Sequence, residues 1–480
     1  MDSVARALAL KAISDAKGKA SLVDGKVPAS ELPSATEESA GIMSAEDKLK
    51  LDGITTGTVL YGYRINKNDS NPETRVGYMY DAVGMTPARM NYTTGVFDYG
   101  SWENAWFITQ NKPCALRYDG TVDYYLDPND YTKKADGTDS DLFVLLTEEP
   151  SDWATKYNQY FAKNGGEFAP VTGESAPVFA ADTYYSSFAY DGNFMASIPT
   201  VWVRRWEDAN YVYTAISNKQ VAPDFHAYAH DAGDGYINDY FYAPMFKGVA
   251  IDGKLRSVAG VCITKYTGSS QSVHNCITNM EPGWEIWDWS KYQLITSLLT
   301  LIAKTTNLGE AFGHGIQSSP PFPLNNSSGG GRFSGTNADD DHSVKTLHIE
   351  NFWSRRVETM YGAARSGTTF YYKNVRPYGH FGSYALINSG KELPSDSGYI
   401  EDLYIGNFGF VPKEVGGSNS SYYCGWLSTG TNPDCPMCFG SANGPREVYG
   451  PYSLECWATS GFARWYIGGS PCYNATHESE

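Results

Sequence analysis

The pattern of hydrophobic and polar positions divides the chain into a helical and extended N-terminal part and a long part rich in strands. In residues 1–20, Val4 and Leu8 recur among alanines, the best helix formers, which predicts a helix. Residues 21–57 contain two prolines and an Asp-Gly pair, which predict an extended tether. From residue 58 onward, β-branched and aromatic residues form short runs between turn residues. The clearest predicted strands are 58–65, 199–206, 212–217 and 258–266.

One segment of this second part has the spacing of a helix. Hydrophobic residues recur at helical intervals across 290–305, and Ser290 stands where an N-cap residue is preferred. The stripe consists of Tyr292, Ile295, Leu298, Leu299 and Ile302. A stretch rich in Gly, Ser, Asn and Pro follows at 318–343, which predicts a long, exposed and mobile loop.

The tether contains a short predicted helix at 44–52, with Ser44 at its N-cap and Gly53 at its end. An isolated helix of this length is unstable in water because nucleation is costly. Two readings are open: a surface helix in a linker, or a joint where copies of the chain pack together through a few apolar residues. In the second reading, the predicted oligomerisation residues are Val4, Leu8, Leu49, Leu51 and Ile54.

Composition and charge narrow the class of protein. The 480 residues include 36 Tyr, 12 Trp, 21 Phe and 48 Gly, with 19% charged residues, which favours a globular body with many strands and turns. A formal net charge of −17 argues against nucleic acid or an anionic membrane as the main partner. The N-terminus lacks the apolar core and cleavage site of a signal peptide, and no apolar run approaches about 18 residues. We therefore expect neither a signal peptide nor membrane insertion.

Motifs for catalysis or metal binding are weak. The sequence contains no G-x-S-x-G, P-loop or H-E-x-x-H motif. Cys435 and Cys438 supply two of the four ligands of a zinc site, and Cys424 and Cys456 are the candidates for the other two. The alternative is that Cys435 and Cys438 are reduced thiols. His226 and His230, and the acidic stretches 231–239 and 337–342, are further metal candidates, but none has a complete ligand pattern. We expect no enzyme activity, no cofactor and no metal site.

Clusters of aromatic residues near the C-terminus are the strongest functional signal. Tyr and Trp alternate there with Ser, Asn and Gly, a composition typical of adaptable recognition surfaces, although core aromatics beside ordinary turns would read the same way. The predicted ligand-binding residues are Asn419, Ser420, Tyr422, Tyr423, Trp426, Asn432, Tyr449, Tyr452 and Trp457.

Several segments resemble one family. The tether segment "GIMSAEDKLKLDGI" is similar to the spacers that join trimeric segments of bacteriophage tail-fibre proteins. The body resembles fibre proteins of gut phages with a C-type-lectin-like domain, related in fold to the formylglycine-generating enzymes. The matching stretches include "LYGYRINKNDSNPETRVGYMYDAVGMTP", "NKPCALRYDGTVDYYLDPNDY", "GNFMASIPTVWVRRW", "FYAPMFKGVAIDGKLRSVAG", "WSKYQLITSLLTLIAKTTNLGEAFGHGI" and "HIENFWSRRVETMYG".

This resemblance implies an α+β protein in three parts: an anchoring helix at 1–20, a tether with a short trimer-joint helix at 21–57, and a C-type-lectin-like body at 58–475. The body would have a distorted antiparallel sheet, few helices and a binding surface toward the C-terminus. No cysteine here matches the catalytic cysteines of the enzyme relatives, so the resemblance carries over no catalysis.

The function that the resemblance implies is attachment of a phage to its host. The protein would be made in the bacterial cytoplasm and assembled into the virion as a homotrimer, bound to other virion proteins through its N-terminus and to a host surface glycan or protein through its body. Two alternatives stay open. One is a head fibre or capsid decoration protein with a weak adhesive role, and the other is a glycan-cleaving tailspike depolymerase.

Overall fold

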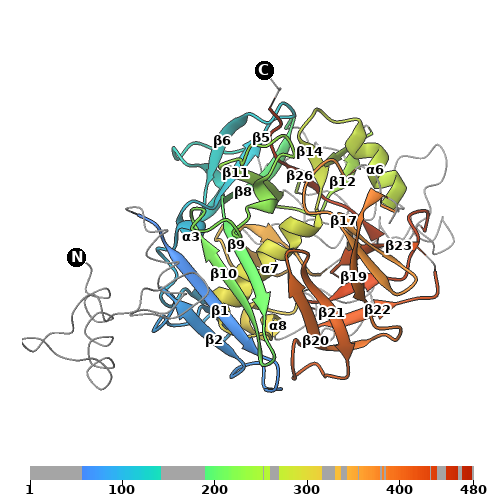
Figure 1. Cartoon of the computed structure of the whole chain (residues 1–480). Coiled ribbons are helices and arrows are strands. Elements are labelled where there is room, and N and C mark those ends of the chain that lie inside the picture. The colour runs from blue at the N-terminus through green and yellow to red at the C-terminus, as the bar shows by residue number, and fades with distance from the viewer. Residues whose placement is uncertain are drawn as a thin grey trace, which may run out of the picture.

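An interior helix, α7, lies at the centre of the molecule with three large β-sheets around it (Figure 1). The computed structural model describes residues 57–141, 190–251, 253–259, 270–315, 330–336, 343–354, 356–378, 381–382, 385–432, 434–440, 450–462 and 467–477. The predicted N-terminal helix, the tether helix and their oligomerisation residues therefore lie outside the described residues.

Helix α7 spans Trp289–Ala303, close to the predicted 290–305. All of its residues are buried, so the predicted one-sided apolar stripe underestimates how enclosed it is. The predicted N-cap is wrong by two residues. Asp288 caps the helix by accepting a hydrogen bond from the Lys291 backbone N–H at 2.9 Å, whereas Ser290 lies in the first turn and donates to the Asn374 carbonyl.

The polar groups of α7 find partners on the surrounding elements. The Gln293 side chain donates to the Phe410 carbonyl at 3.0 Å and accepts from the Phe410 backbone N–H at 2.8 Å. Near the other end, the Ile302 carbonyl accepts from the Ala88 backbone N–H at 2.8 Å and from the Tyr78 hydroxyl at 3.3 Å. These contacts satisfy groups that would be costly to bury alone, and they hold the neighbouring segments against the helix.

A four-stranded antiparallel sheet, in the order β2-β1-β10-β9, packs on one side of α7. Its strands are β1 (Leu60–Asn66), β2 (Val76–Tyr80), β9 (Trp202–Glu207) and β10 (Tyr211–Ser217). The predicted strands at 58–65, 199–206 and 212–217 are thus confirmed, with shifts at their ends.

A seven-stranded antiparallel sheet, in the order β14-β26-β11-β8-β5-β6-β7, lies above this one in Figure 1. Its strands are β5 (Lys112–Leu116), β6 (Val122–Asp127), β7 (Asp130–Lys134), β8 (Asn193–Pro199), β11 (Tyr240–Pro244), β14 (Trp284–Ile286) and β26 (Pro471–Tyr473). Strand β26 comes from the C-terminal end of the chain and pairs with both β11 and β14, so the sheet joins distant parts of the sequence.

The third sheet has nine strands and is formed by the C-terminal part of the chain, orange to red in Figure 1. Its strands are β17 (Val357–Ser366), β18 (Thr369–Tyr372), β19 (Ile387–Glu392), β20 (Gly398–Gly406), β21 (Gly409–Val415), β22 (Trp426–Thr429), β23 (Asp434–Phe439), β24 (Leu454–Cys456) and β25 (Ile467–Gly468). The pairs β22–β24 and β17–β25 are parallel and the others antiparallel.

Smaller elements complete the described part. The helices besides α7 are α3 (Trp106–Thr109), α6 (Ser270–Thr278), α8 (Leu308–Phe312) and the 3₁₀ turn η3 (Tyr228–His230). The two-stranded pairs are β3 (Arg89–Asn91) with β4 (Val96–Asp98), β12 (Val249–Ile251) with β13 (Lys254–Arg256), and β15 (Lys345–Thr346) with β16 (Ile349–Glu350). Among the described helices, none is long and apolar enough to cross a membrane.

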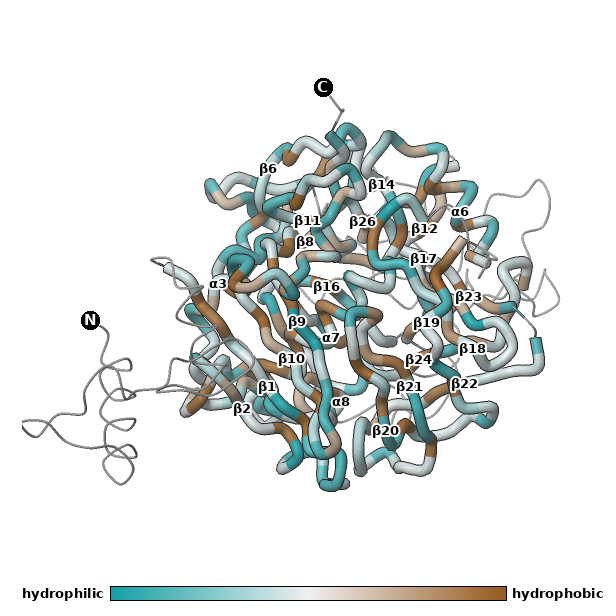
Figure 2. The backbone as a smooth tube through the Cα atoms, in the orientation of Figure 1, coloured by the Kyte–Doolittle hydropathy of each residue, from teal (hydrophilic) through white to brown (hydrophobic). Residues whose placement is uncertain are grey.

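The main hydrophobic core draws residues from Tyr63 to Cys472 and includes both faces of α7. Figure 2 shows hydrophobic positions along strands such as β1 and β10, with hydrophilic positions frequent in the outer loops. The described part is therefore rich in β-strands and has few helices, which confirms this part of the predicted fold class.

Two local predictions are wrong in the described residues. Val258 and Ala259 of the predicted strand 258–266 are not in a strand, because Ser257 leaves β13 to hydrogen-bond with Phe194, and residues 260–266 lie outside the described part. Within the predicted exposed loop 318–343, the described residues 330–336 include a buried side chain, Phe333, which stacks on Phe97 with ring centroids 4.1 Å apart. The remainder of that loop is outside the described residues, apart from 343.

The interior position of α7 leads to a prediction about stability. Leu298 is fully buried, so Leu298→Ala should destabilise the body by about 2–5 kcal/mol, whereas Leu298→Met should cost less than about 1.5 kcal/mol. Urea unfolding followed by tryptophan fluorescence and circular dichroism measures both variants. We expect one shared transition for the two probes, and two separate transitions would contradict a common core around α7.

Candidate functional site

Two of the predicted ligand-binding residues are in the core, which corrects that part of the prediction. Tyr423 and Tyr452 are 1% and 3% exposed, and their rings pack against each other with centroids 5.2 Å apart. The Tyr452 hydroxyl lies 2.8 Å from the Thr300 hydroxyl of α7. The C-terminal segments fold back onto the central helix here, so these two tyrosines stabilise the fold and are unavailable to a ligand.

A first group of the predicted residues stays accessible beside β20 and β22. Asn419 and Ser420 are exposed, and Tyr422 and Trp426 are partly exposed. The Trp426 ring makes a T-shaped contact with Tyr399 of β20 at 5.0 Å. Turn 416–422 is held to the same strand, because the Gly416 backbone N–H donates to the Tyr399 carbonyl at 2.9 Å. Tyr399 therefore contacts both the Trp426 ring and the turn that carries Asn419, Ser420 and Tyr422.

A second group lies past the ends of β22 and β24. The Asn432 amide donates to the Trp457 carbonyl at 2.5 Å, and the partly exposed Trp457 ring packs edge-on against Phe462 at 5.0 Å. The parallel pairing of β22 with β24 places Thr429 beside Cys456, so Trp457 lies along the sheet from Trp426. Tyr449, the remaining predicted contact, is outside the described residues.

The metal candidates are used in other ways by the structure. Cys435 and Cys438 lie in β23. Like the other described cysteines, they are buried and form no disulfide, and burial raises the pKa of Cys435 to about 11. His230 is buried against the Ile198 carbonyl, and desolvation lowers its pKa to about 3. Asp231 and Asp234 accept hydrogen bonds from backbone N–H groups of their own turn. Among the residues that the structure describes, no three His, Cys, Asp or Glu side chains stand together as metal ligands.

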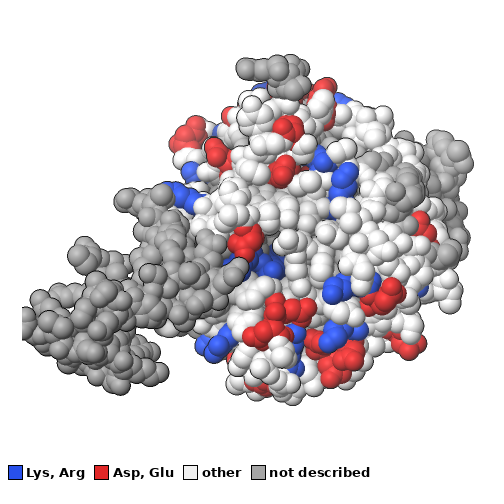
Figure 3. Space-filling view, viewed as in Figure 1, with Lys and Arg blue, Asp and Glu red and all other residues white. Residues whose placement is uncertain are grey.

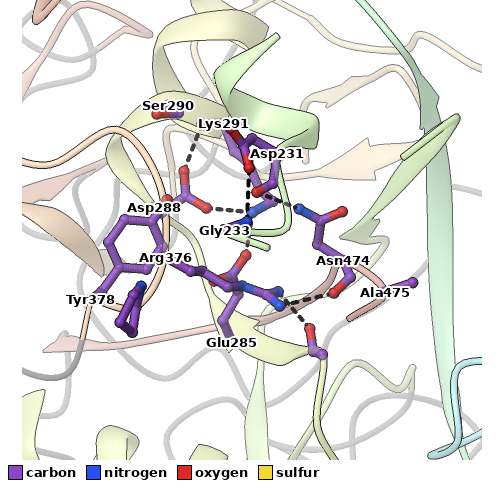
Figure 4. Close-up of polar contacts among 12 residues, drawn as sticks. Asp231, Gly233, Glu285, Asp288, Ser290, Lys291, Arg376, Tyr378, Asn474 and Ala475 are labelled. Carbon is purple, nitrogen blue, oxygen red and sulfur yellow. Dashed lines mark hydrogen bonds and ion pairs between the residues drawn. The ribbon is translucent and has the colours of Figure 1, made fainter. Parts of the chain in front are cut away.

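A buried ion network lies at the N-terminal end of α7 (Figure 4). Lys291 pairs with both Glu285 and Asp288, and Arg376 Nε donates to Glu285 at 2.7 Å. Desolvation raises the pKa of Asp288 to about 6. Desolvation also acts to raise the pKa of Glu285, but the charges of Arg376 and Lys291 outweigh it and lower this pKa to about 2. Both carboxylates are buried and neutralised by cations, so the network holds segments together and offers no accessible acid–base pair.

Arg376 links this network to two further chain segments, at Gly283 and at Asn474. Its guanidinium donates to the Gly283 carbonyl at 2.7 Å and to the Asn474 carbonyl at 2.9 Å. The Asn474 amide in turn donates to the Asp231 carbonyl at 3.2 Å. Segments near residues 231, 285, 376 and 474 are thus fixed relative to α7, as Figure 4 shows.

A small hollow lies beside this network, and the sequence analysis did not predict it. Val201, Val203 and Arg205 line it from one side, since alternate residues of an extended segment share a face. His226 is held there by paired backbone hydrogen bonds with Val203 of 2.9 and 3.0 Å, and its ring stacks on Tyr228 at 4.7 Å.

The opposite wall of the hollow is formed by α7 and two turns. Gln293 of α7 lines it, as do Asn374 and Asn407, and the Asn374 amide donates to the Asn407 carbonyl at 2.7 Å. Gly409 has a φ of +93°, and a Cβ there would approach the Gln293 side chain to 2.6 Å, so the turn between β20 and β21 packs this closely because the residue is glycine.

Arg205 is the charged group of this hollow. Its Nη2 donates to the Gln293 carbonyl at 3.3 Å and to the Ser297 hydroxyl at 3.1 Å, whereas its buried Nε has no hydrogen-bond partner. A signal for this site exists in the sequence "VWVRRW", because Arg205 occupies the next inward-facing position after Val201 and Val203. The other walls come from distant segments and have no such signal.

Charge on the molecular face of Figure 3 is mixed, with acidic and basic side chains close together. The comparisons with known proteins add no assignment: no protein-family model matches the chain, and no curated protein matches it.

Glu455, a buried glutamate that accepts a hydrogen bond from Trp457, should make the stability of the protein depend on pH. Burial raises the pKa of Glu455 to about 7 from its usual 4.5, although Trp457 Nε1 donates to its carboxylate at 2.8 Å. A raised native pKa gives stability that is present below pH 4.5 and is lost as the pH rises through 7. The free energy of unfolding of Glu455→Gln, relative to that of the wild type, should therefore rise by up to about 3 kcal/mol as the pH increases from 4.5 to 8.

Urea unfolding at pH 4.5 and pH 8 measures this difference. The control is Glu414→Gln, because Glu414 is exposed. We expect the control variant to follow the wild type. A Glu455→Gln variant with the same stability difference from wild type at both pH values would contradict the raised pKa.

Proposed function

We propose that this protein is a non-enzymatic attachment protein, a virion fibre whose body binds a glycan or protein on the host surface. The observation that carries the proposal is the set of accessible residues Trp426 on β22 and Asn419, Ser420 and Tyr422 on the turn before it, which combines aromatic faces with short polar side chains. The similarity of the tether and body segments to phage fibre proteins supports the same reading.

Rigidity makes such a surface effective in binding. The β22 residue next to Trp426, Leu427, is fully buried, as is Leu454 beside it on β24. The sheet therefore holds the outward side chains in place before any ligand arrives, and aromatic anchors have little rotamer freedom left to lose. Losing one such anchor typically costs about 2 kcal/mol or more of binding free energy.

We further propose that the body is C-type-lectin-like and that the chain forms a homotrimer through residues 1–57. Its richness in strands and few helices support the first point, and the predicted helix at 44–52 supports the second. Three copies of a weak site on one fibre raise avidity by roughly 10²-fold or more where the geometry allows simultaneous contact. The protein would act in the virion, anchored to other virion proteins through its N-terminus, without metal or cofactor.

The proposal predicts a specific loss of adsorption. The double change Tyr422→Ala and Trp426→Ala should lower adsorption of virions or purified trimer to host cells at least about tenfold, because two anchors are removed. Tyr236→Ala, at a tyrosine that is 56% exposed and packs against His477, is the matched control and should adsorb normally. Wild-type adsorption by the double variant, and also by Trp457→Ala, would contradict attachment through these aromatics.

A second prediction concerns assembly. Deleting residues 1–57 should leave a folded body that is monomeric at micromolar concentration, because the proposed trimer contacts are removed. Light scattering of the full-length and truncated proteins measures this. A full-length chain that is monomeric under the same conditions would contradict the trimer.

A further inference from the structure

We infer that Arg75, at the end of the loop between β1 and β2, is a positioning residue for Tyr422, one of the accessible aromatic residues of the proposed attachment function. The inference deepens that function by naming a distant residue on which the aromatic contact depends, and its consequence for binding rests on that function. Arg75 is 2% exposed, so it acts through Tyr422 and does not touch a ligand itself.

The first observation is the backbone of the turn that carries Tyr422. Tyr422 and Cys424 have φ angles of +54° and +51°, in the left-handed region that residues with bulky side chains rarely adopt. Such conformations persist only where the surrounding structure holds them, and they concentrate at functional sites. The turn therefore depends on contacts from other parts of the chain.

The second observation is that the β1–β2 loop supplies such a contact to the main chain of Tyr422. The Tyr422 backbone N–H donates to the Ser70 carbonyl at 2.8 Å, and its carbonyl accepts from the Thr306 hydroxyl. The loop is itself braced, because the Thr74 hydroxyl donates to the Asp69 carboxylate at 2.7 Å. These hydrogen bonds fix the backbone at Tyr422, and its ring must be placed by other groups.

The third observation is the position of the Arg75 guanidinium against this ring. Arg75 Cζ lies 5.3 Å from the centroid of the Tyr422 ring and 4.5 Å from the centroid of the Tyr423 ring. A cation within about 6 Å of an aromatic centroid is attracted to the negative face of the ring. Since Tyr423 is in the core, the shared guanidinium connects the accessible ring of Tyr422 to a ring that is fixed.

The hydrogen bonds of Arg75 hold the guanidinium in this position. Its Nε and Nη2 atoms donate to the Asn66 carbonyl at 3.4 and 3.2 Å. Its Nη1 atom is buried and has no hydrogen-bond partner among the described residues. Attraction between a cation and an aromatic face is stronger when the cation is desolvated, so the two tyrosine rings are important partners of this charge.

Hydrogen exchange of the full-length protein, followed by mass spectrometry, tests the positioning. The Tyr422 amide is protected by Ser70 only while the turn is in place. In Arg75→Met, which loses the charge, the peptide that contains this amide should exchange at least about threefold faster, whereas α7 should not change. Arg75→Lys keeps the charge but not the planar group, so its exchange should lie between those of Arg75→Met and wild type.

The matched control is Arg64→Met. Arg64 is an exposed arginine of β1, and its Cζ lies 4.7 Å from the centroid of the Tyr211 ring, so the variant removes the same kind of contact at another place. Its exchange at Tyr422 should equal that of wild type. Wild-type exchange at Tyr422 in folded Arg75→Met would overturn the inference. If Arg75→Met does not fold, wild-type exchange at Tyr422 in Arg75→Lys would overturn it.

Adsorption of purified trimer to host cells tests the consequence for binding. Folded Arg75→Met should adsorb at least about threefold more weakly than wild type, and Arg75→Lys should recover part of this loss. Arg64→Met should adsorb normally. A residue that only stabilised the fold would leave the adsorption of the folded protein unchanged, so this measurement distinguishes positioning from a general structural role.

The aromatic variants separate this inference from the proposed function. If the double change at Tyr422 and Trp426 lowers adsorption but folded Arg75→Met adsorbs normally, attachment stands and the positioning role of Arg75 is overturned. If Arg75→Met speeds exchange at Tyr422 but neither variant lowers adsorption, Arg75 still holds the turn and attachment through these aromatics is overturned.

Discussion

A helix buried on every side requires that each of its polar groups find a partner inside the protein, and the described part of this structure depends on that requirement. Helix α7 meets it with groups from all three large sheets: Phe410 of β21 pairs with Gln293, Tyr78 of β2 with the Ile302 carbonyl, and Glu285 of β14 with Lys291. Each contact satisfies a buried group and also fixes the position of a strand or turn. The sheets are thus arranged around the helix by hydrogen bonding as well as by hydrophobic burial.

The charged groups at the N-terminal end of α7 extend this constraint to the candidate site. Asp288 both caps the helix and pairs with Lys291, while Glu285 pairs with Lys291 and Arg376. Removal of one member would leave a buried charge without its partner, which typically costs about 3–5 kcal/mol, so the segments are held in one arrangement. Asn374, two residues before Arg376, is part of the hollow beside this network, and its carbonyl accepts from Ser290. The network and the hollow therefore share the same supporting segments.

Local patterns in the sequence predicted the local structure and missed what depends on distant segments. Alternating β-branched and aromatic residues identified β1, β9 and β10, and helical spacing identified α7, because these signals arise within one element. Composition could not distinguish surface aromatics from core ones: Trp426 and Tyr423 have similar neighbours, but only Tyr423 meets the core side of the sheet. The hollow was missed because its walls come from residues near 205, 226, 293 and 407, which only the fold brings together.

Through these contacts, α7 unites the surrounding sheets into one cooperative body that positions the candidate site. Hydrogen exchange of the full-length protein, followed by mass spectrometry, tests this most directly. Backbone amides in β9, α7 and β21 should exchange at one slow rate, since each is released only when the whole body unfolds. Exchange in β9 or β21 that is orders of magnitude faster than in α7 would show that these sheets open independently, and would contradict the claim.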